Sequence, residues 1–119
     1  MSEVVDLRAK LAALKAPFDP RVVATLNDYK VQVVRVEGEF VWHSHPESDD
    51  FFLVLDGALT IQLRDGDVEL GPGQLYVVPA GVEHCPRSDG ADVLLIEPLG
   101  TPNTGDAPGQ RTMPERGVD

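Results

Sequence analysis

Turn-forming residues divide the middle of this chain at short, regular intervals, and this spacing most limits its fold. Asp56-Gly57 and Asp65-Gly66 each follow an apolar run, and Asp-Gly pairs of this kind favour the tight turns of β-hairpins. Residues 71–73 (Gly-Pro-Gly) and 79–81 (Pro-Ala-Gly) mark two further turns. The runs between these turns are short and show no helical period, so the sequence predicts a series of short strands.

The runs themselves are rich in β-branched and aromatic residues, which suit strands. We expect about nine strands, at residues 22–26, 29–37, 39–45, 51–55, 59–63, 68–70, 75–78, 82–87 and 92–97. Many short strands with evenly spaced turns indicate an all-β fold, either a barrel or a sandwich.

The two ends of the chain differ from this middle. Residues 2–16 carry apolar side chains at helical spacing, and Pro17 follows, so a short amphipathic helix is expected there. Residues 100–119 are rich in Pro and Gly, which predicts a flexible tail, loosely docked or disordered. We therefore divide one domain into a helical segment (1–19), a barrel (20–99) and this tail.

Composition narrows the choice of partners and compartment. Ten basic and twenty acidic residues give a net charge of −10, which argues against nucleic acid and anionic membranes as partners. Residues 1–15 include charges where a signal peptide needs an apolar core, and no apolar run is long enough to cross a membrane. Cys85 is the single cysteine, so no internal disulfide forms. We expect a cytoplasmic protein.

The chain has three histidines, and two of them stand one residue apart. On an extended strand His43 and His45 project from the same side, about 7 Å apart. His84 from a later strand and a carboxylate from the next strand would complete a shell that suits zinc, iron, nickel or manganese. An immunoglobulin-like sandwich, the structural alternative, gives no reason for three histidines to meet. We therefore favour a jelly-roll barrel around a metal site.

Two spaced motifs between about residues 38 and 88 resemble those of the cupin family. The first is a glycine, His-x-His, a carboxylate and a second glycine, filled here by Gly38, His43, His45, Asp50 and Gly57. The second is filled by Gly73, Pro79, Gly81 and His84. The resemblance implies a small single-domain cupin with a double-stranded β-helix, in which His43, His45 and His84 bind a divalent ion of Fe, Mn, Zn or Ni.

The chain departs from the cupin pattern in three places. Four residues, where the family has five, separate Gly38 from His43, and Ser88 stands where the family has Asn. Asp50 occupies the position of a Glu ligand and is shorter by one methylene, about 1.5 Å of reach. Three roles stay open for Asp50: a direct ligand, a ligand through water, or an acceptor that orients an imidazole.

Strand alternation predicts the surroundings of this site. Phe52 and Val54 are expected to line the cavity, whereas Phe51, Leu53 and Leu55 face the other way. This second apolar stripe requires a cover. We expect it to pack under the N-terminal helix or to form a homodimer interface, as the resemblance to small cupins suggests.

Three residues are the candidates for proton transfer in catalysis: Glu47, Tyr76 and Glu83. Cys85 directly follows His84 and therefore faces away from the metal, so we expect it to be a buried small hydrophobe.

These observations favour a metal-dependent enzyme that acts on a small oxygen-bearing molecule. The chemistry would be sugar-isomerase-like, with the metal as a Lewis acid, or dioxygenase-like, with activation of O2. The rival hypothesis is a non-catalytic cupin that binds or senses a small ligand, because no obvious second catalytic group accompanies the metal ligands.

Overall fold

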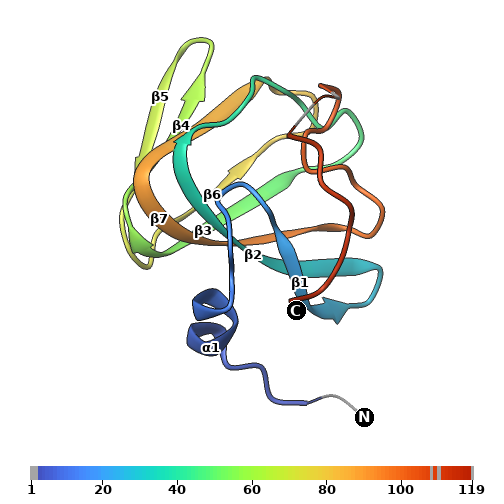
Figure 1. Cartoon of the computed structure of the whole chain (residues 1–119). Helices are drawn as coiled ribbons and strands as arrows, with labels where there is room; N and C mark the ends of the chain where they lie inside the picture. The colour runs from blue at the N-terminus through green and yellow to red at the C-terminus, as the bar shows by residue number, and fades with distance from the viewer. Residues whose placement is uncertain (1–2, 108, 110, 119) are drawn as a thin grey trace.

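The structure describes residues 3–107, 109 and 111–118 of the chain in a computed structural model. Its elements are α1 (Leu7–Ala12), β1 (Arg21–Leu26), β2 (Tyr29–Glu39), β3 (Asp50–Gly57), β4 (Leu59–Leu63), β5 (Gly66–Leu70), β6 (Leu75–Val78) and β7 (His84–Pro98). The strands form a barrel, and the helix lies outside it (Figure 1). The expected all-β, jelly-roll fold with a short N-terminal helix is confirmed.

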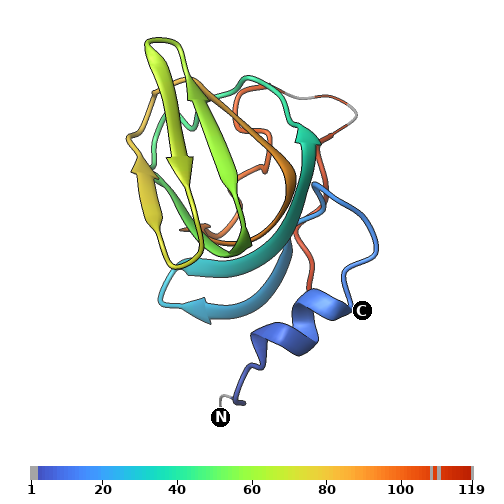
Figure 2. The ribbon, with the colours of Figure 1, turned by 90° about the vertical axis from the view of Figure 1, so that its left-hand side faces the viewer.

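The long strand β7 holds the barrel together. It pairs antiparallel with β2 along most of its length, with β3 through residues 91–96 and with β4 through residues 84–87. The main path of the sheet runs β1-β2-β7-β3-β6, and β5 pairs with β4. The strands curl around a common interior (Figure 2). The first residues of β7 pair with β4 and its later residues pair with β3, so one strand joins different parts of the barrel.

Two glycines that were predicted to separate strands instead bend them. Gly38 (φ 103°) lies inside β2, beside a register shift in the pairing with β7, and Gly90 (φ 150°) lies inside β7. These backbone conformations favour glycine, and they allow a strand to curve without leaving its ladder. Residues 82–87 and 92–97 were therefore wrongly separated, because His84–Pro98 is one strand.

Alternation along β3 sorts its side chains as predicted. Phe52 and Val54 are buried in the barrel, and the residues that alternate with them, Phe51, Leu53 and Leu55, are only partly buried. The interior cluster also draws apolar side chains from β2, β4, β6 and β7. Burial of this apolar surface is the main stabilising contribution to the fold.

The outside of the same sheet carries two rows of apolar side chains. Cross-strand pairing aligns both rows across β2, β7, β3 and β6, and the β2 member of the first row, Val33, is fully buried. The outer apolar face consists of Leu94, Leu53 and Leu75 in the first row and Val31, Ile96, Phe51 and Val77 in the second. Leu75 is 54% exposed and Val77 is 39% exposed. Leu55 instead borders a groove beside α1.

The N-terminal helix is shorter than the predicted span of residues 2–16. α1 begins after Asp6, whose side chain caps the helix by accepting hydrogen bonds from the N–H groups of Arg8 and Ala9. It ends at Ala12, and Ser2 lies outside the described residues. In the described part of the chain, no helix is long and apolar enough to cross a membrane.

Residues 101–107 and 111–117 pack against the barrel, whereas a loose tail was predicted. Arg116 pairs with Asp19, and the Oε2 atom of Glu115 lies 2.6 Å from Nζ of the buried Lys30. These contacts are polar, so the low apolar content of the segment gave no sign of them. The expected division of the chain into three segments stays a prediction.

Candidate metal centre

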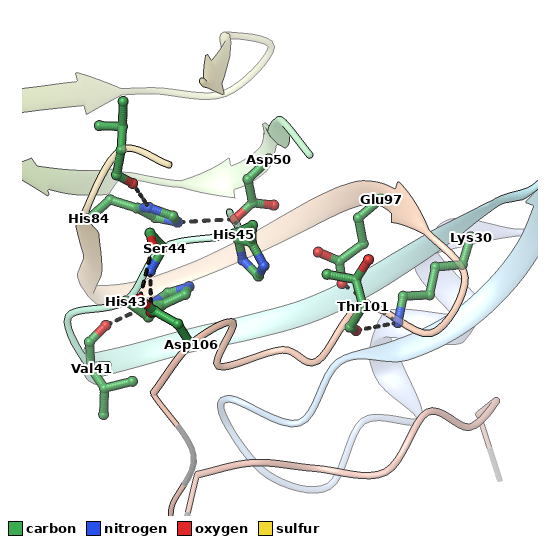
Figure 3. A network of polar contacts seen from close by, with 11 residues as sticks. Lys30, Val41, His43, Ser44, His45, Asp50, His84, Glu97, Thr101 and Asp106 are labelled. Carbon is green, nitrogen blue, oxygen red and sulfur yellow. Dashed lines mark hydrogen bonds and ion pairs between the residues drawn. The ribbon is translucent and has the colours of Figure 1, made fainter. Parts of the chain in front are cut away.

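Three histidines and one aspartate gather inside the barrel (Figure 3). They are His43, His45, Asp50 and His84, and one ligand atom from each lies within 4.8 Å of those of the others. All four side chains are buried. They come from the segment after β2, the first residue of β3 and the first residue of β7. The structure therefore brings together the four residues predicted as metal ligands.

Backbone pairing aligns two of these histidines. Of the predicted strand over residues 39–45, Glu39 alone lies in a regular strand, as the last residue of β2. His43 then forms a single antiparallel bridge with His84. The N–H of His43 donates to the carbonyl of His84 at 3.0 Å, and the reverse bond is 2.9 Å long. The two imidazole rings consequently lie with their centroids 4.3 Å apart.

Hydrogen bonds select the tautomer of these two rings. Nδ1 of His43 lies 2.8 Å from the carbonyl oxygen of Val41, and Nδ1 of His84 lies 2.9 Å from that of Val82. A carbonyl oxygen only accepts, so each Nδ1 carries a hydrogen. In the neutral ring Nε2 then keeps its lone pair, which is the arrangement that a metal ligand needs.

Asp50 reaches this cluster in spite of its short side chain. Its Oδ2 atom lies 3.1 Å from Nε2 of His84 and 3.2 Å from Nε2 of His45. Its Oδ1 atom and Nδ1 of His45 are buried and have no hydrogen-bond partner in the described structure. A buried polar atom without a partner is costly, so these atoms point to a missing ligand or solvent molecule. Direct ligation by Asp50 stays a prediction.

Electrostatics favour a neutral His43 ring and an ionised Asp50. Burial, together with the neighbouring His84, lowers the pKa of His43 to about 4. Burial alone would raise the pKa of Asp50, but interactions with the neighbouring His45 and His84 outweigh it and lower the pKa to about 2. Asp50 in turn raises the pKa of His45 against the effect of burial. His43 is thus neutral, and Asp50 is ionised, near neutral pH.

The donor set fits a divalent first-row ion. Oδ2 of Asp50 lies 3.1 and 3.2 Å from two histidine nitrogens, and all four ligand atoms are close enough together to share one ion. Imidazole nitrogens with one carboxylate oxygen suit Fe, Mn, Zn and Ni. The cluster has the chemistry to bind one such ion.

A small cavity borders the candidate metal centre. Its volume is about 50 Å³, several times what one water needs. Most of its lining is apolar, including Val34, Val36, Phe40, Phe52, Val93 and Leu95. Beyond the metal cluster, the polar side chains that the described structure places on its wall are Glu97 and Asn103.

Glu97 belongs to a buried pair of ionisable side chains, with Lys30, that the sequence analysis missed. Glu97 is 3% exposed and Lys30 is 2% exposed, and their Oε1 and Nζ atoms are 3.7 Å apart. Burial and the charge of Asp50 raise the pKa of Glu97 to about 7, against the opposing effect of Lys30. Strand phase could have revealed Glu97, because it shares the inward face of β7 with Val93 and Leu95.

The predicted proton-transfer residues lie elsewhere. Glu47 is exposed and borders a separate groove together with His45. Glu83 is exposed and pairs with Arg64 at 3.4 Å. Tyr76 is half-buried against the interior cluster. None of the three lines the cavity described above, and their catalytic role stays a prediction.

Cys85 is fully buried and is not a member of the metal cluster. Burial, with a contribution from the charge of Glu39, raises the pKa of its thiol to about 11. The thiol therefore stays protonated near neutral pH, which agrees with the prediction of a buried small hydrophobe.

The fold and the site together define a small double-stranded β-helix barrel with a buried cluster of three histidines and one aspartate. A family model described as a cupin domain matches residues 30–97, more than half of the chain. The chain belongs to the cupin family.

Similar proteins support this assignment. The uncharacterized protein YdbB of Bacillus subtilis (strain 168) is 33% identical over 89 residues, which are 74% of this chain and 79% of that protein. A cupin-2 domain containing protein from Shewanella frigidimarina NCIMB 400 is 42% identical with a TM-score of 0.78, over 80% of this chain and 94% of that one. The protein NMB1881 from Neisseria meningitidis is 31% identical with a TM-score of 0.74, over 81% and 99%. Each of these likenesses therefore covers about three quarters or more of this chain.

Proposed function

We propose that this cupin binds a divalent first-row metal ion through His43, His45, His84 and Asp50 and acts with it on a small oxygen-bearing molecule. The main observation in support is that four buried side chains each offer one metal-ligand atom and that these atoms lie within 4.8 Å of one another. A bound ion would supply Lewis acidity or, as iron, the ability to activate O2. The chain's own part is to hold the ion in a shielded, largely apolar cavity.

The cavity wall favours a ligand with an apolar body over a sugar. Apolar side chains such as Phe40, Phe52 and Leu95 form most of it. A sugar hydroxyl buried there without a partner would be costly, and beyond the metal cluster the described lining offers Glu97 and Asn103. This composition supports dioxygenase-like chemistry over sugar-isomerase-like chemistry.

Glu97 is the group that we assign to proton transfer in this proposal. It lines the same cavity as the cluster, and its pKa of about 7 is suited to exchanging a proton near neutral pH. Glu47, Tyr76 and Glu83 stay predictions for the same role, but none of them borders the cavity.

A non-catalytic module that binds or senses a small ligand is the second candidate function. The exposed positions of Glu47 and Glu83 favour it, because neither of these predicted proton-transfer groups lines the cavity beside the cluster. Such a module would hold the ion and the ligand without converting the ligand.

We also propose a homodimer in which the outer apolar faces of two copies meet. Seven apolar side chains in two aligned rows, with Leu75 54% exposed, support this arrangement. Each buried Å² of apolar surface stabilises such a contact by roughly 25 cal/mol.

A cytoplasmic location stays a proposal, supported by the single cysteine.

Elemental analysis of protein purified without added metal tests the metal claim. We expect nearly one first-row ion per chain, and a sharp loss in His84→Ala because one of four donors is removed. The exposed Glu83→Ala is the matched control and should keep its metal. A folded wild-type protein that neither carries a first-row ion nor binds one on addition would refute the proposal.

Activity assays then separate the two candidate functions. Oxygen uptake with a panel of small phenols, keto acids and thiols tests dioxygenase-like chemistry, and an aldose–ketose screen tests isomerase-like chemistry. Binding of a panel member without turnover in either assay would favour the non-catalytic module.

A further inference from the structure

The two-histidine segment 43–45 is held through its backbone from three directions. His43 pairs with His84 in the antiparallel bridge, and the carbonyl of His45 accepts from the N–H of Gly81. Both of these partners lie inside residues 30–97, the part that the cupin model matches. The third anchor, at Ser44, comes from Asp106 in the C-terminal segment.

Asp106 contacts every polar group of Ser44 (Figure 3). The N–H of Ser44 donates to Oδ1 of Asp106 at 2.7 Å, and its hydroxyl donates to Oδ2 at 3.0 Å. The N–H of Asp106 donates in return to the carbonyl of Ser44 at 3.0 Å. Ser44 is only 6% exposed, so its backbone groups depend on protein partners more than on water. Loss of Asp106 would leave a buried donor without this acceptor.

Gly105 shows how closely the C-terminal segment approaches the ligands. It has φ +53°, and a Cβ atom added there would collide with the carbonyl oxygen of Ser44 and come within 3.2 Å of Cδ2 of His43. Only glycine permits this approach at this backbone conformation. The segment therefore lies directly against the backbone and one imidazole of the candidate metal centre.

The rest of the C-terminal segment is tied down on both sides of this contact. Lys30 Nζ donates to the carbonyl of Thr101 at 2.9 Å and to Glu115 at 2.6 Å. Arg116 pairs with Asp19 at 2.9 Å. We call residues 101–107 and 111–117 the C-terminal strap. Anchors on both sides fix Asp106 in place although its own side chain is exposed.

We propose that the C-terminal strap sets the geometry of the metal site and that Asp106 is its positioning residue. Asp106 acts through Ser44, which lies between the two ligands in sequence and whose hydroxyl donates to Asp106 in the strap. Partners that orient the ligands of a metal typically change its affinity by about 10- to 100-fold when removed. This inference rests on the proposed function, because it requires that the cluster binds a metal.

Titration of the metal-free protein with Co²⁺, read by visible absorption and by competition with a chelating indicator, tests the inference. Asp106→Ala should weaken Co²⁺ binding by about tenfold or more and change the absorption spectrum, since the histidine positions relax. Asp106→Asn keeps an acceptor for the Ser44 N–H, and we expect it to restore most of the affinity. Asp89→Ala, the loss of an exposed aspartate in the bend of β7, should leave binding unchanged.

Gly105→Ala provides an independent test because it pushes the strap off Ser44 without removing Asp106. We expect weaker Co²⁺ binding, whereas Gly100→Ala, at φ +84° with nothing within 4 Å of the added Cβ, controls for backbone strain. If Asp106→Ala fails to fold, the comparison of Gly105→Ala with Gly100→Ala tests the inference by itself. Tight binding with the wild-type spectrum in both test variants would overturn the inference, whereas a wild-type chain that binds no Co²⁺ would overturn the proposed function.

Discussion

Replacement of Glu97 by Gln should change how the stability of the metal-free protein depends on pH. Lys30 Nζ is 2.6 Å from Glu115 but 3.7 Å from Glu97, so Glu115 supplies most of the neutralising charge. Asp50, on the neighbouring strand, adds a negative charge that disfavours ionisation of Glu97, and His45 opposes it weakly. Glu97 is therefore more stable as the neutral acid, which Gln imitates in size and charge.

The magnitude follows from the two pKa values of this side chain. In the folded protein burial raises the pKa of Glu97 to about 7 from the ordinary value of 4.5. Below about pH 4.5 the acid is protonated in both states, and between about 4.5 and 7 the unfolded chain gives up a proton that the folded chain keeps. Stability is consequently lost as pH rises through this window, by about 3 kcal/mol in total.

Urea unfolding of wild type and Glu97→Gln at intervals from pH 4.5 to pH 8, in the presence of a chelator, measures this difference. We expect the free energy of unfolding of wild type to fall relative to the variant by about 3 kcal/mol up to pH 7 and to stay level above it. Titration of groups that do not interact with Glu97 cancels in the comparison. A difference that does not change with pH would refute the raised pKa of Glu97 and its assigned role in proton transfer.

Two further predictions concern the fold and the assembly. Gly57→Ala should lower the free energy of unfolding by about 2 kcal/mol or more, because φ is +79° and the new Cβ meets the carbonyl oxygen of Gly90. Gly73→Ala is the control, since Gly73 has the same φ with nothing within 4 Å of an added Cβ. An equal loss of stability in both variants would show that the close approach to Gly90 does not matter. Leu53→Glu, in the middle of the outer apolar face, should convert a dimer to a monomer in sedimentation velocity, whereas Val82→Glu should not. A wild-type monomer at micromolar concentration would contradict the proposed dimer.

The barrel and the ligand cluster were accessible from sequence because local rules determine them. Turn pairs such as Asp65-Gly66 fixed the hairpins, and alternation in β3 correctly assigned Phe52 to the interior and Phe51 to the outside. The spacing of His43 and His45 placed both rings on one side of an extended segment. The bends at Gly38 and Gly90 were misread because a glycine with positive φ occurs both in turns and in curved strands.

Contacts between distant parts of the chain were not accessible in the same way. The bond from Ser44 to Asp106 spans 62 residues, and that from Lys30 to Glu115 spans 85. Both depend on the path that the chain takes after β7, which no local pattern describes. Exposed acidic side chains in a Pro- and Gly-rich segment look the same in sequence whether they meet solvent or a buried partner.

The C-terminal strap therefore contacts both the ligand segment, at Ser44, and the Lys30–Glu97 pair, at Lys30. Asp106 holds Ser44 between two candidate ligands, and Glu115 neutralises Lys30, which would otherwise pair with Glu97 alone. Under the strap proposal, lifting this segment would loosen the ligands and, by leaving Lys30 with Glu97 as its remaining carboxylate, favour the ionised form of Glu97. Metal affinity and the proton affinity of Glu97 are then coupled through a part of the chain that lies outside the matched cupin region.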